Sequence, residues 1–286
     1  MVLINFLLRF SIFLLIITFI ASCSSTRLIY TLAEKFIKDE VSFFVYLDSK
    51  EEVILNESVS EVMIWHRTFI LPNYAKFLKD TAAKLEANKY NKSEVSEILR
   101  NGRFLIEETI TGLTPYASRF LIRHQSVEAI KFIEKKMEFR RKQRLKELSK
   151  PQNILYKNRI NRLIKNFERF LGGELNDAQV ELLEIHARAT IDDVKVRLNN
   201  RTMRQKVFLE FLRTQPSEKE LTNYLNKLLL AGHTIINPSY QTFSEISLDR
   251  FTVLLVEILQ ISSYEQREKL KEKLLSYAAE FNELSL

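Results

Sequence analysis

The stretch Ile160-Asn-Arg-Leu-Ile-Lys-Asn-Phe-Glu-Arg-Phe-Leu-Gly-Gly173 decides the fold class. Its large apolar residues recur three or four positions apart, which is the spacing of one face of an α-helix. These residues are Ile160, Leu163, Ile164, Phe167 and Phe170. Gly172 follows them, and glycine commonly ends helices because it adopts left-handed backbone angles without strain. The stretch therefore predicts an amphipathic helix that ends at Gly172.

Helix start signals recur on both sides of this stretch. A Ser or Asn followed three residues later by Glu or Gln is typical of the capping box at a helix N-terminus. The pattern occurs at Ser49–Glu52, Asn91–Glu94, Asn176–Gln179 and Ser217–Glu220. Thr114-Pro115 predicts one more start, because proline is favoured at the first helical position.

Glycine and proline are scarce, with five of each in 286 residues, which favours long helices with few turns. Pro72 predicts a helix start after a break near Thr68, and Gly112 predicts a helix end. The segment Phe251–Leu259 is almost wholly apolar, so we expect it at the centre of the core. The segment Val41–Leu47 has the composition of a strand, but no partner strand is visible. We expect it to be a buried extended connection or an irregular helix.

These signals predict an all-α fold of roughly eight to ten helices, packed in one or two bundles. The basic segment Lys131–Lys150, which ends beside Pro151, is the expected divide if there are two halves. No flexible linker accompanies it.

Residues 1–22 have the pattern of a cleaved bacterial signal peptide. Arg9 is their only charged residue, and the largely apolar run Phe10–Ile20 follows it. This run is short for a membrane-spanning helix, which needs about 20 apolar residues. Ile20-Ala-Ser-Cys23 then resembles the lipobox of bacterial lipoproteins, so we expect cleavage before Cys23 and lipid on its thiol. The alternative is an uncleaved signal anchor with an incidental cysteine.

Cys23 is the only cysteine, which excludes a disulfide framework and a thiolate metal site. Two or more acyl chains hold a protein stably at a membrane, so lipid on Cys23 would suffice as an anchor. Ser24 replaces the aspartate that is typical of inner-membrane retention, so by analogy we expect the outer membrane, facing the periplasm. The expected parts are a signal peptide (1–22), a lipidated segment and connection (23–48) and a helical domain (49–286), with a subdivision near residue 150 as an alternative.

The formal net charge is +7, and removal of residues 1–22 lowers it by one. This modest excess of positive charge is compatible with a location close to anionic lipid or peptidoglycan. The expected export argues against nucleic acid as a partner. The most basic stretch, Lys135–Lys146, is interrupted by Glu138. It predicts either a solvated helix end, where basic residues are favourable, or a contact with anionic headgroups. Both alternatives stay open.

Trp65-His-Arg67 is the most distinctive local motif. Val62, Trp65 and Phe69 share one helical face, so we expect Trp65 to face the core. In one interpretation, nearby polar side chains bind an anionic group such as a lipid phosphate or a glycan carboxylate. These candidate binding residues are His66, Arg67 and Tyr74. In the interpretation that we favour, the segment is a helix–helix corner in which Trp65 packs and Pro72 fixes the turn.

The region around this motif resembles a family of bacterial lipoproteins of unknown function, domain of unknown function 6279. The matching blocks are Arg27-Leu-Ile-Tyr30, Val45-Tyr-Leu-Asp48, Trp65-His-Arg67, Leu71-Pro72 and Tyr74. A weaker similarity occurs at Phe170–Gln179, where the family often has Leu-Thr-Pro-Glu-Gln and this chain has Asn-Asp-Ala in the middle. The family has no established activity, so the resemblance implies a localisation and a fold rather than a function.

The sequence offers no catalytic or metal-binding pattern. Its four histidines lack the Glu-x-x-His and zincin spacings, and there is no Gly-x-Ser-x-Gly elbow or phosphate-binding loop. Asp192 and Asp193 lie near His186, but arginines four residues away predict a solvated, salt-bridged helix face. We therefore expect no enzyme activity, no metal and no cofactor.

The leading functional hypothesis is a lipid-anchored, non-catalytic envelope protein that binds a partner or serves a structural role. Its partners would be the membrane through Cys23 and an anionic lipid, peptidoglycan or an envelope protein. The alternative is a helical periplasmic chaperone, for which Leu175–Gln179 gives the one hint. An enzyme is the third hypothesis.

Overall fold

The structure is a computed structural model that describes residues 25–285. The predicted signal peptide (1–22) and Cys23 lie outside the described residues. Every regular element within residues 25–285 is a helix, so the all-α prediction is confirmed. Two of the helices continue into one another, which gives ten helical rods in this range, at the upper end of the prediction.

The described part of the chain begins with α2 (Ser25–Phe44), so most of the expected connection at residues 23–48 is helical. The expectation of an extended or irregular Val41–Leu47 is wrong as far as Phe44, because this end of α2 packs into the core. Val45 follows the helix and is buried. Asp48, rather than Ser49, then caps the next helix: its carboxylate accepts the backbone N–H groups of Lys50 and Glu51, each at 2.9 Å.

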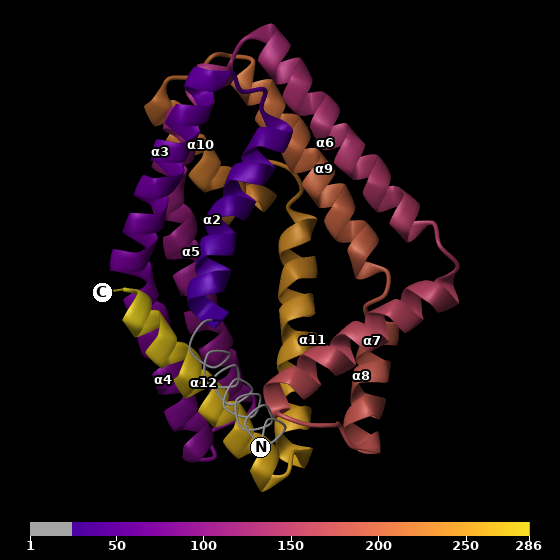
Figure 1. Ribbon diagram of the computed structural model, residues 1–286. Helices are drawn as coiled ribbons and strands as arrows, with labels where there is room; N and C mark the ends of the chain where they lie inside the picture. The colour runs from indigo at the N-terminus through magenta and orange to yellow at the C-terminus, as the bar shows by residue number, and fades with distance from the viewer. Residues whose placement is uncertain (1–24, 286) are drawn as a thin grey trace, which may run out of the picture.

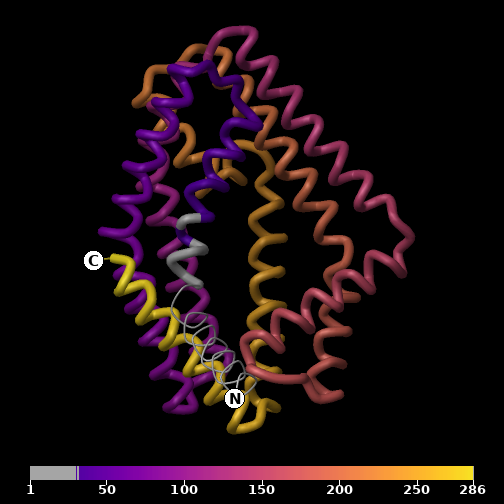
Figure 2. The backbone as a smooth tube through the Cα atoms, viewed as in Figure 1, coloured from indigo at the N-terminus to yellow at the C-terminus, as the bar shows by residue number. Residues whose placement is uncertain are grey.

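The next rod consists of α3 (Ser49–Trp65), a π-helical turn (His66–Ile70) and α4 (Leu71–Glu86). The predicted break near Thr68 and the predicted corner are therefore wrong (Figure 2). The backbone N–H of Leu71 bonds to the carbonyl of His66, five residues back. This widened turn holds one extra residue, which lets the helix continue past Pro72.

The long helix α5 (Lys92–Leu121) continues through both Gly112 and Pro115, so the predicted end and new start there are wrong. Pro115 has no N–H to give to the carbonyl of Thr111. The Thr114 hydroxyl donates to that carbonyl instead, at 2.9 Å. Gly112 is required for packing: a Cβ at this position would overlap with the indole ring of Trp65.

The middle of the chain follows the sequence signals closely. It forms α6 (Val127–Leu148), α7 (Gln152–Leu171), α8 (Asp177–Ala189), α9 (Asp193–Leu212) and α10 (Glu218–Leu230). Gly172 ends α7 with a left-handed φ of +75°, as predicted. The capping boxes of Asn176 with Gln179 and of Ser217 with Glu220 are both present.

The last two helices are α11 (Ser239–Ile261) and α12 (Tyr264–Leu284). As expected for the apolar segment 251–259, α11 runs through the middle of the molecule, between α5 and α8 (Figure 1). Helix α12 lies along α4 and also touches α7. Ser263 and Gln266 form a capping box at its start that the sequence predictions did not include.

Many of the buried side chains form two separate clusters, and others, such as Leu71, Ala75 and Ala278, lie outside both. The first lies among α2, α3, α5, α6, α9 and α10, around Leu212 and Leu221. The second lies among α7, α8 and α11, around Leu183 and Ile258. The first cluster contains side chains from both sides of residue 150, so a single cut at that point does not separate the two.

Candidate functional site

The π-helical turn gathers an aromatic cluster that includes two of the three predicted site residues. The Tyr30 hydroxyl lies 2.9 Å from Nδ1 of His66 and donates to the carbonyl of Met63 at 3.2 Å. Because a hydroxyl has one proton, it serves both contacts only when His66 Nδ1–H is the donor. Burial raises the pKa of Tyr30 to about 12, opposed by the charge of Arg67. Burial also lowers the pKa of His66, which favours the neutral form of its ring.

Tyr74 lies beside His66, whereas Arg67 does not join them. The Tyr74 and His66 rings meet edge to face at 6.0 Å, and the Tyr74 hydroxyl lies 2.7 Å from the hydroxyl of Thr109. Arg67 is exposed, with its guanidinium 5.9 Å from the centre of the Tyr30 ring. The polar side-chain contacts of His66 and Tyr74 are thus with other side chains of the fold.

Trp65 connects the π-helical turn to α5. Its ring occupies the space over Gly112 and lies 6.2 Å from the ring of Tyr116. Trp65 is half-buried, and Phe69, which the pattern placed on the same core face, is 63 % exposed. The expected stripe fails at Phe69 because the extra residue of the π-turn rotates the following side chains around the helix.

A cleft of about 800 Å³ lies on the other side of Tyr74, and we call it the α4–α5–α11 cleft. Hydrophobic side chains form most of its walls: Phe77, Ile98, Leu105, Ile106, Leu248 and Phe251. Tyr74 and Phe281 are also in its lining, and their rings lie 6.4 Å apart. The two arginines that reach it already have carboxylate partners, since Arg103 pairs with Glu107 at 2.8 Å and Arg197 with Asp193 at 3.9 Å.

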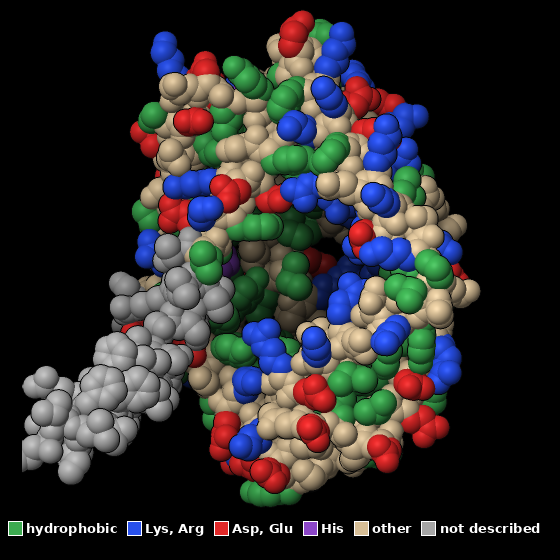
Figure 3. Space-filling view, turned by 45° about the vertical axis from the view of Figure 1, so that its right-hand side comes forward, with side chains coloured by type: hydrophobic (Ala, Val, Ile, Leu, Met, Phe, Trp, Pro, Cys, Tyr) green, Lys and Arg blue, Asp and Glu red, His purple; other side chains and the backbone are tan. Residues whose placement is uncertain are grey.

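Two further clefts adjoin each other along α9. The α5–α9–α10 cleft, of about 600 Å³, has hydrophobic walls that include Leu113, Leu228 and Leu229. The α6–α9 cleft, of about 650 Å³, is lined by Phe44 and mostly by charged and polar side chains. Arg201 and Gln205 line both clefts. Figure 3 shows a deep hollow in one face of the molecule, with hydrophobic and basic side chains on different parts of its wall.

The sequence predictions missed these clefts, because they arise between helices that lie far apart along the chain. A partial signal was present in α9: Arg197, Arg201 and Arg204 recur at helical spacing and share one face. The basic segment of α6 was identified from the sequence. Its residues differ in whether they form salt bridges. Arg140 pairs with Glu40 at 2.7 Å, whereas Arg144 has no salt bridge within the described residues.

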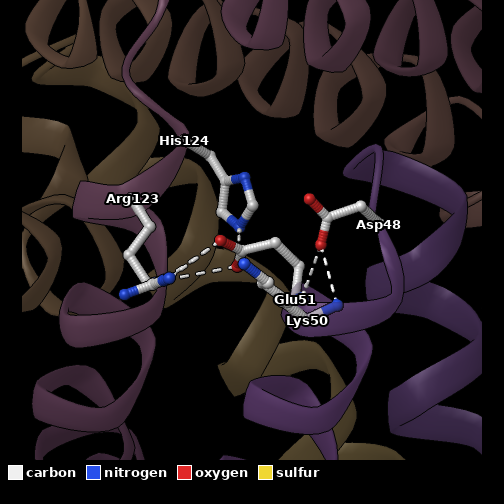
Figure 4. Close-up of polar contacts among 5 residues, drawn as sticks. All are labelled: Asp48, Lys50, Glu51, Arg123 and His124. Carbon is white, nitrogen blue, oxygen red and sulfur yellow. Dashed lines mark hydrogen bonds and ion pairs between the residues drawn. The ribbon is translucent and has the colours of Figure 1, made fainter.

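A polar cluster joins the start of α3 to the end of α5 (Figure 4). The guanidinium of Arg123 donates to the Glu51 carboxylate at 2.9 Å, and Nε2 of His124 lies 3.4 Å from the same carboxylate. His124 is buried, and this burial lowers its pKa, although the charge of Glu51 acts in the opposite direction. The Phe120 ring lies 4.7 Å from that of His124. These contacts link α3 to the end of α5, so we assign the cluster a structural role.

Within residues 25–285, no three His, Cys, Asp or Glu side chains come close enough together to hold a metal ion. The expected salt-bridged face near His186 is present with partly different partners: Asp192 pairs with Lys195 at 3.1 Å rather than with Arg188, and Arg188 pairs with Glu184 at 2.6 Å. Nor does any helix in this part of the chain have the length and apolarity needed to cross a membrane.

Comparison with protein families gives one match: residues 44–241 match a family of unknown function, DUF6279. The chain belongs to this family. The match covers all of α3 to α10, including Trp65, His66, Arg67 and Tyr74, so the resemblance noted in the sequence is confirmed. No curated protein matches this DUF6279 chain. No solved structure matches it either.

Proposed function

We propose that this DUF6279 protein is a lipid-anchored, non-catalytic binding module of the bacterial envelope, and that the α4–α5–α11 cleft binds an apolar chain. The lipobox-like sequence before Cys23 supports the anchor, and Ser24 supports the periplasmic face of the outer membrane. The binding role rests on one observation: hydrophobic side chains are left exposed within a concave surface.

Two lining residues carry this observation. Ile106 on α5 is 57 % exposed and Leu248 on α11 is 39 % exposed, although both face a cleft of about 800 Å³. Clefts of this size with mostly hydrophobic walls are typical of ligand sites. An acyl chain or another extended apolar group would remove these side chains from water, at about 25 cal/mol per Å² of apolar surface buried.

The predicted cluster of His66, Arg67 and Tyr74 contributes to this proposal only through Tyr74, which lines the cleft. Burial lowers the pKa of His66, and its Nδ1 is already hydrogen-bonded to Tyr30, so His66 is a poor partner for an anion. We therefore place the binding surface in the cleft and treat the cluster as its support.

The test uses a fluorescent, uncharged probe, N-phenyl-1-naphthylamine, with residues 24–286, a chain that contains the whole described fold. Ile106→Arg puts a charge into the cleft and should weaken probe binding about tenfold or more. Ile64→Arg is the matched control, because Ile64 is 55 % exposed on α3 and is absent from the cleft lining. Equal probe binding by the Ile106→Arg variant and the unmodified chain would refute the proposed site.

The anchor has a separate test. The full chain should incorporate radiolabelled fatty acid in a bacterial host, and Cys23→Ser should abolish the labelling. Persistent labelling of the Cys23→Ser chain would contradict the lipoprotein assignment without bearing on the cleft.

The chaperone alternative loses its sequence hint, because Gln179 has a structural task. It is fully buried, closes the capping box of α8, and its amide lies 3.0 Å from the side-chain oxygen of Gln266 at the start of α12. Displacement of the probe by unfolded hydrophobic peptides, but not by single-chain lipids, would favour the chaperone role.

A further inference from the structure

We infer that the two adjoining clefts along α9 form a second binding site, for one anionic phospholipid molecule. At least one of its acyl chains would lie in the α5–α9–α10 cleft, and its phosphate would bind Arg201 and Arg144 in the α6–α9 cleft. This site is separate from the α4–α5–α11 cleft and does not depend on whether that cleft binds a ligand.

The position of Arg201 carries the inference. Arg201 lines both a cleft with mainly hydrophobic walls and a cleft with mainly charged and polar walls. It has no salt bridge within the described residues, in contrast to Arg140 and Arg141 on the neighbouring helix, which pair with Glu40 and Glu138, each at 2.7 Å. A guanidinium at such a boundary fits a ligand in which only a short glycerol linker separates the anionic phosphate from the acyl chains.

The carboxylates in the α6–α9 cleft are already held by other cations. Glu40 accepts from Arg140 at 2.7 Å, and Glu147 pairs with Lys150 at 2.8 Å. Arg144 contributes weakly to lowering the pKa of Glu147, after the larger effect of Lys150, but it forms no salt bridge in residues 25–285. The cleft therefore retains positive charge from Arg144 and Arg201. A guanidinium group can donate two parallel hydrogen bonds to the oxygens of one phosphate.

The apolar half of the site is built by three helices. Leu113 on α5 and Leu228 and Leu229 on α10 face Phe208 on α9, and Leu229 is 45 % exposed. Arg204 also lines this cleft, and the middle of its side chain lies against the segment around Gly232. The volume of about 600 Å³ is within the range of small-molecule sites. An acidic helical peptide would need a long open groove, whereas the short acyl part and the single phosphate of one lipid match two short clefts joined at Arg201.

The test is calorimetric titration of residues 24–286 with dihexanoyl phosphatidylglycerol below its micelle concentration. Dihexanoyl phosphatidylcholine, which has no net charge, and inorganic phosphate are the comparison ligands. We expect phosphatidylglycerol to bind, phosphatidylcholine to bind much more weakly, and inorganic phosphate alone to give no measurable heat. Equal affinity for the two lipids, or binding of phosphate alone, would overturn the inference.

Charge-reversal variants locate the headgroup. Arg201→Glu should weaken phosphatidylglycerol binding about tenfold or more, because it removes a charge-assisted contact and adds repulsion. Arg201→Lys should retain more affinity than Arg201→Glu because it keeps the charge. Arg100→Glu is the matched control, since Arg100 is exposed on α5 and lines neither cleft. An equal loss in the Arg100→Glu variant would show attraction by overall charge and overturn the site.

A second pair of variants locates the chain. Leu229→Arg should weaken binding about tenfold, while Leu275→Arg, at 43 % exposure on α12, should leave it unchanged. Both leucines are already partly in water, so neither change is expected to prevent folding. Unchanged phosphatidylglycerol binding by the Leu229→Arg variant would overturn the placement of the acyl chain and with it the two-cleft site.

Discussion

Two neighbouring rods each contain a proline inside a helix, and they accommodate it in different ways. In α5, the Thr114 hydroxyl takes the carbonyl that Pro115 cannot reach, and α-helical geometry is kept. The residue before Pro72 is Leu71, which has no such hydroxyl, and here the chain forms a π-helical turn. The comparison indicates that a side-chain donor next to a proline spares the backbone from changing its hydrogen-bond pattern.

The difference determines which rod carries the aromatic cluster. The added residue in the π-helical turn brings His66 to Tyr30 and turns Phe69 outward. The regular geometry of α5 keeps Gly112 opposite Trp65, where the two rods approach closely. The two rods are complementary at this contact. The α3–α4 rod supplies the indole ring of Trp65, and α5 supplies the space for it at Gly112.

The largest expected effect comes from removing the ring. Trp65→Ala should lower the free energy of unfolding by about 2–3 kcal/mol, below the range for a fully buried tryptophan, because Trp65 is half-buried. Urea unfolding measures this, with Phe69→Ala, four residues further along the same rod, as the control. Phe69 is 63 % exposed, so its loss should cost no more than about 0.5 kcal/mol. Equal losses of stability in the Trp65→Ala and Phe69→Ala variants would mean that the two rings contribute equally to packing, contrary to the difference in their burial.

The second prediction removes the space rather than the ring. Gly112→Ala should destabilise the protein by about 1–3 kcal/mol, because the new methyl group overlaps with the indole of Trp65. In a Trp65→Ala background the same change should become stabilising by about 0.5 kcal/mol, because alanine is a better helix former than glycine. If Gly112→Ala costs the same stability in both backgrounds, contact with Trp65 is not the reason for the cost.

The third prediction addresses the hydroxyl that accommodates Pro115. Thr114 is buried, and its hydroxyl also lies 2.8 Å from Oδ1 of Asn226, which competes with the Thr111 carbonyl for the single hydroxyl proton. Thr114→Val should cost about 1–2 kcal/mol, because it leaves buried polar groups without partners. The cost should shrink when Pro115→Ala restores the backbone N–H. Thr111→Val, at an exposed position of the same helix, should have little effect in the same unfolding measurement.

The smallest effect is a dependence on pH. Burial lowers the pKa of His66 beside the π-turn and of His124 after α5, from the unfolded value of about 6.5. The unfolded chain therefore binds more protons just below this pH, and the free energy of unfolding should fall as the pH drops from 7 towards 5. Urea unfolding at several pH values tests this, and His66→Gln should flatten part of the slope. A protein that gains stability over this interval would contradict the sign.

Local signals in the sequence predicted the fold where a helix boundary depends on its own residues. The stop at Gly172 and the capping boxes at Asn176 and Ser217 are examples, because each needs only contacts within one turn. The predictions failed at Gly112 and Pro115, which look like a helix end and a helix start when read alone. Their role comes from Trp65 and Thr114, and the packing of another rod overrides the local preference.

The candidate site was less accessible to sequence reasoning than the fold. Tyr74 was predicted as a candidate for binding an anionic group, and the structure places it in the lining of the α4–α5–α11 cleft. Arg201 and Ile106 could not be predicted as site residues, because the helices that form a cleft are distant in sequence. In the sequence, an exposed residue that lines a cleft has no feature that distinguishes it from other exposed residues of the same helix. Only the spacing of the arginines on α9 gave an early indication.

The contact between Tyr30 and His66 also limits how far the folded body could move from a membrane. Helix α2 begins at Ser25, two residues after Cys23, and this contact fixes it to the rod that follows. If Cys23 carries lipid, the tether between the bilayer and the first helix spans only about 7 Å when fully extended. Such a short tether would keep the molecule against the membrane surface, where it would meet lipids leaving the bilayer rather than targets deep in the periplasm.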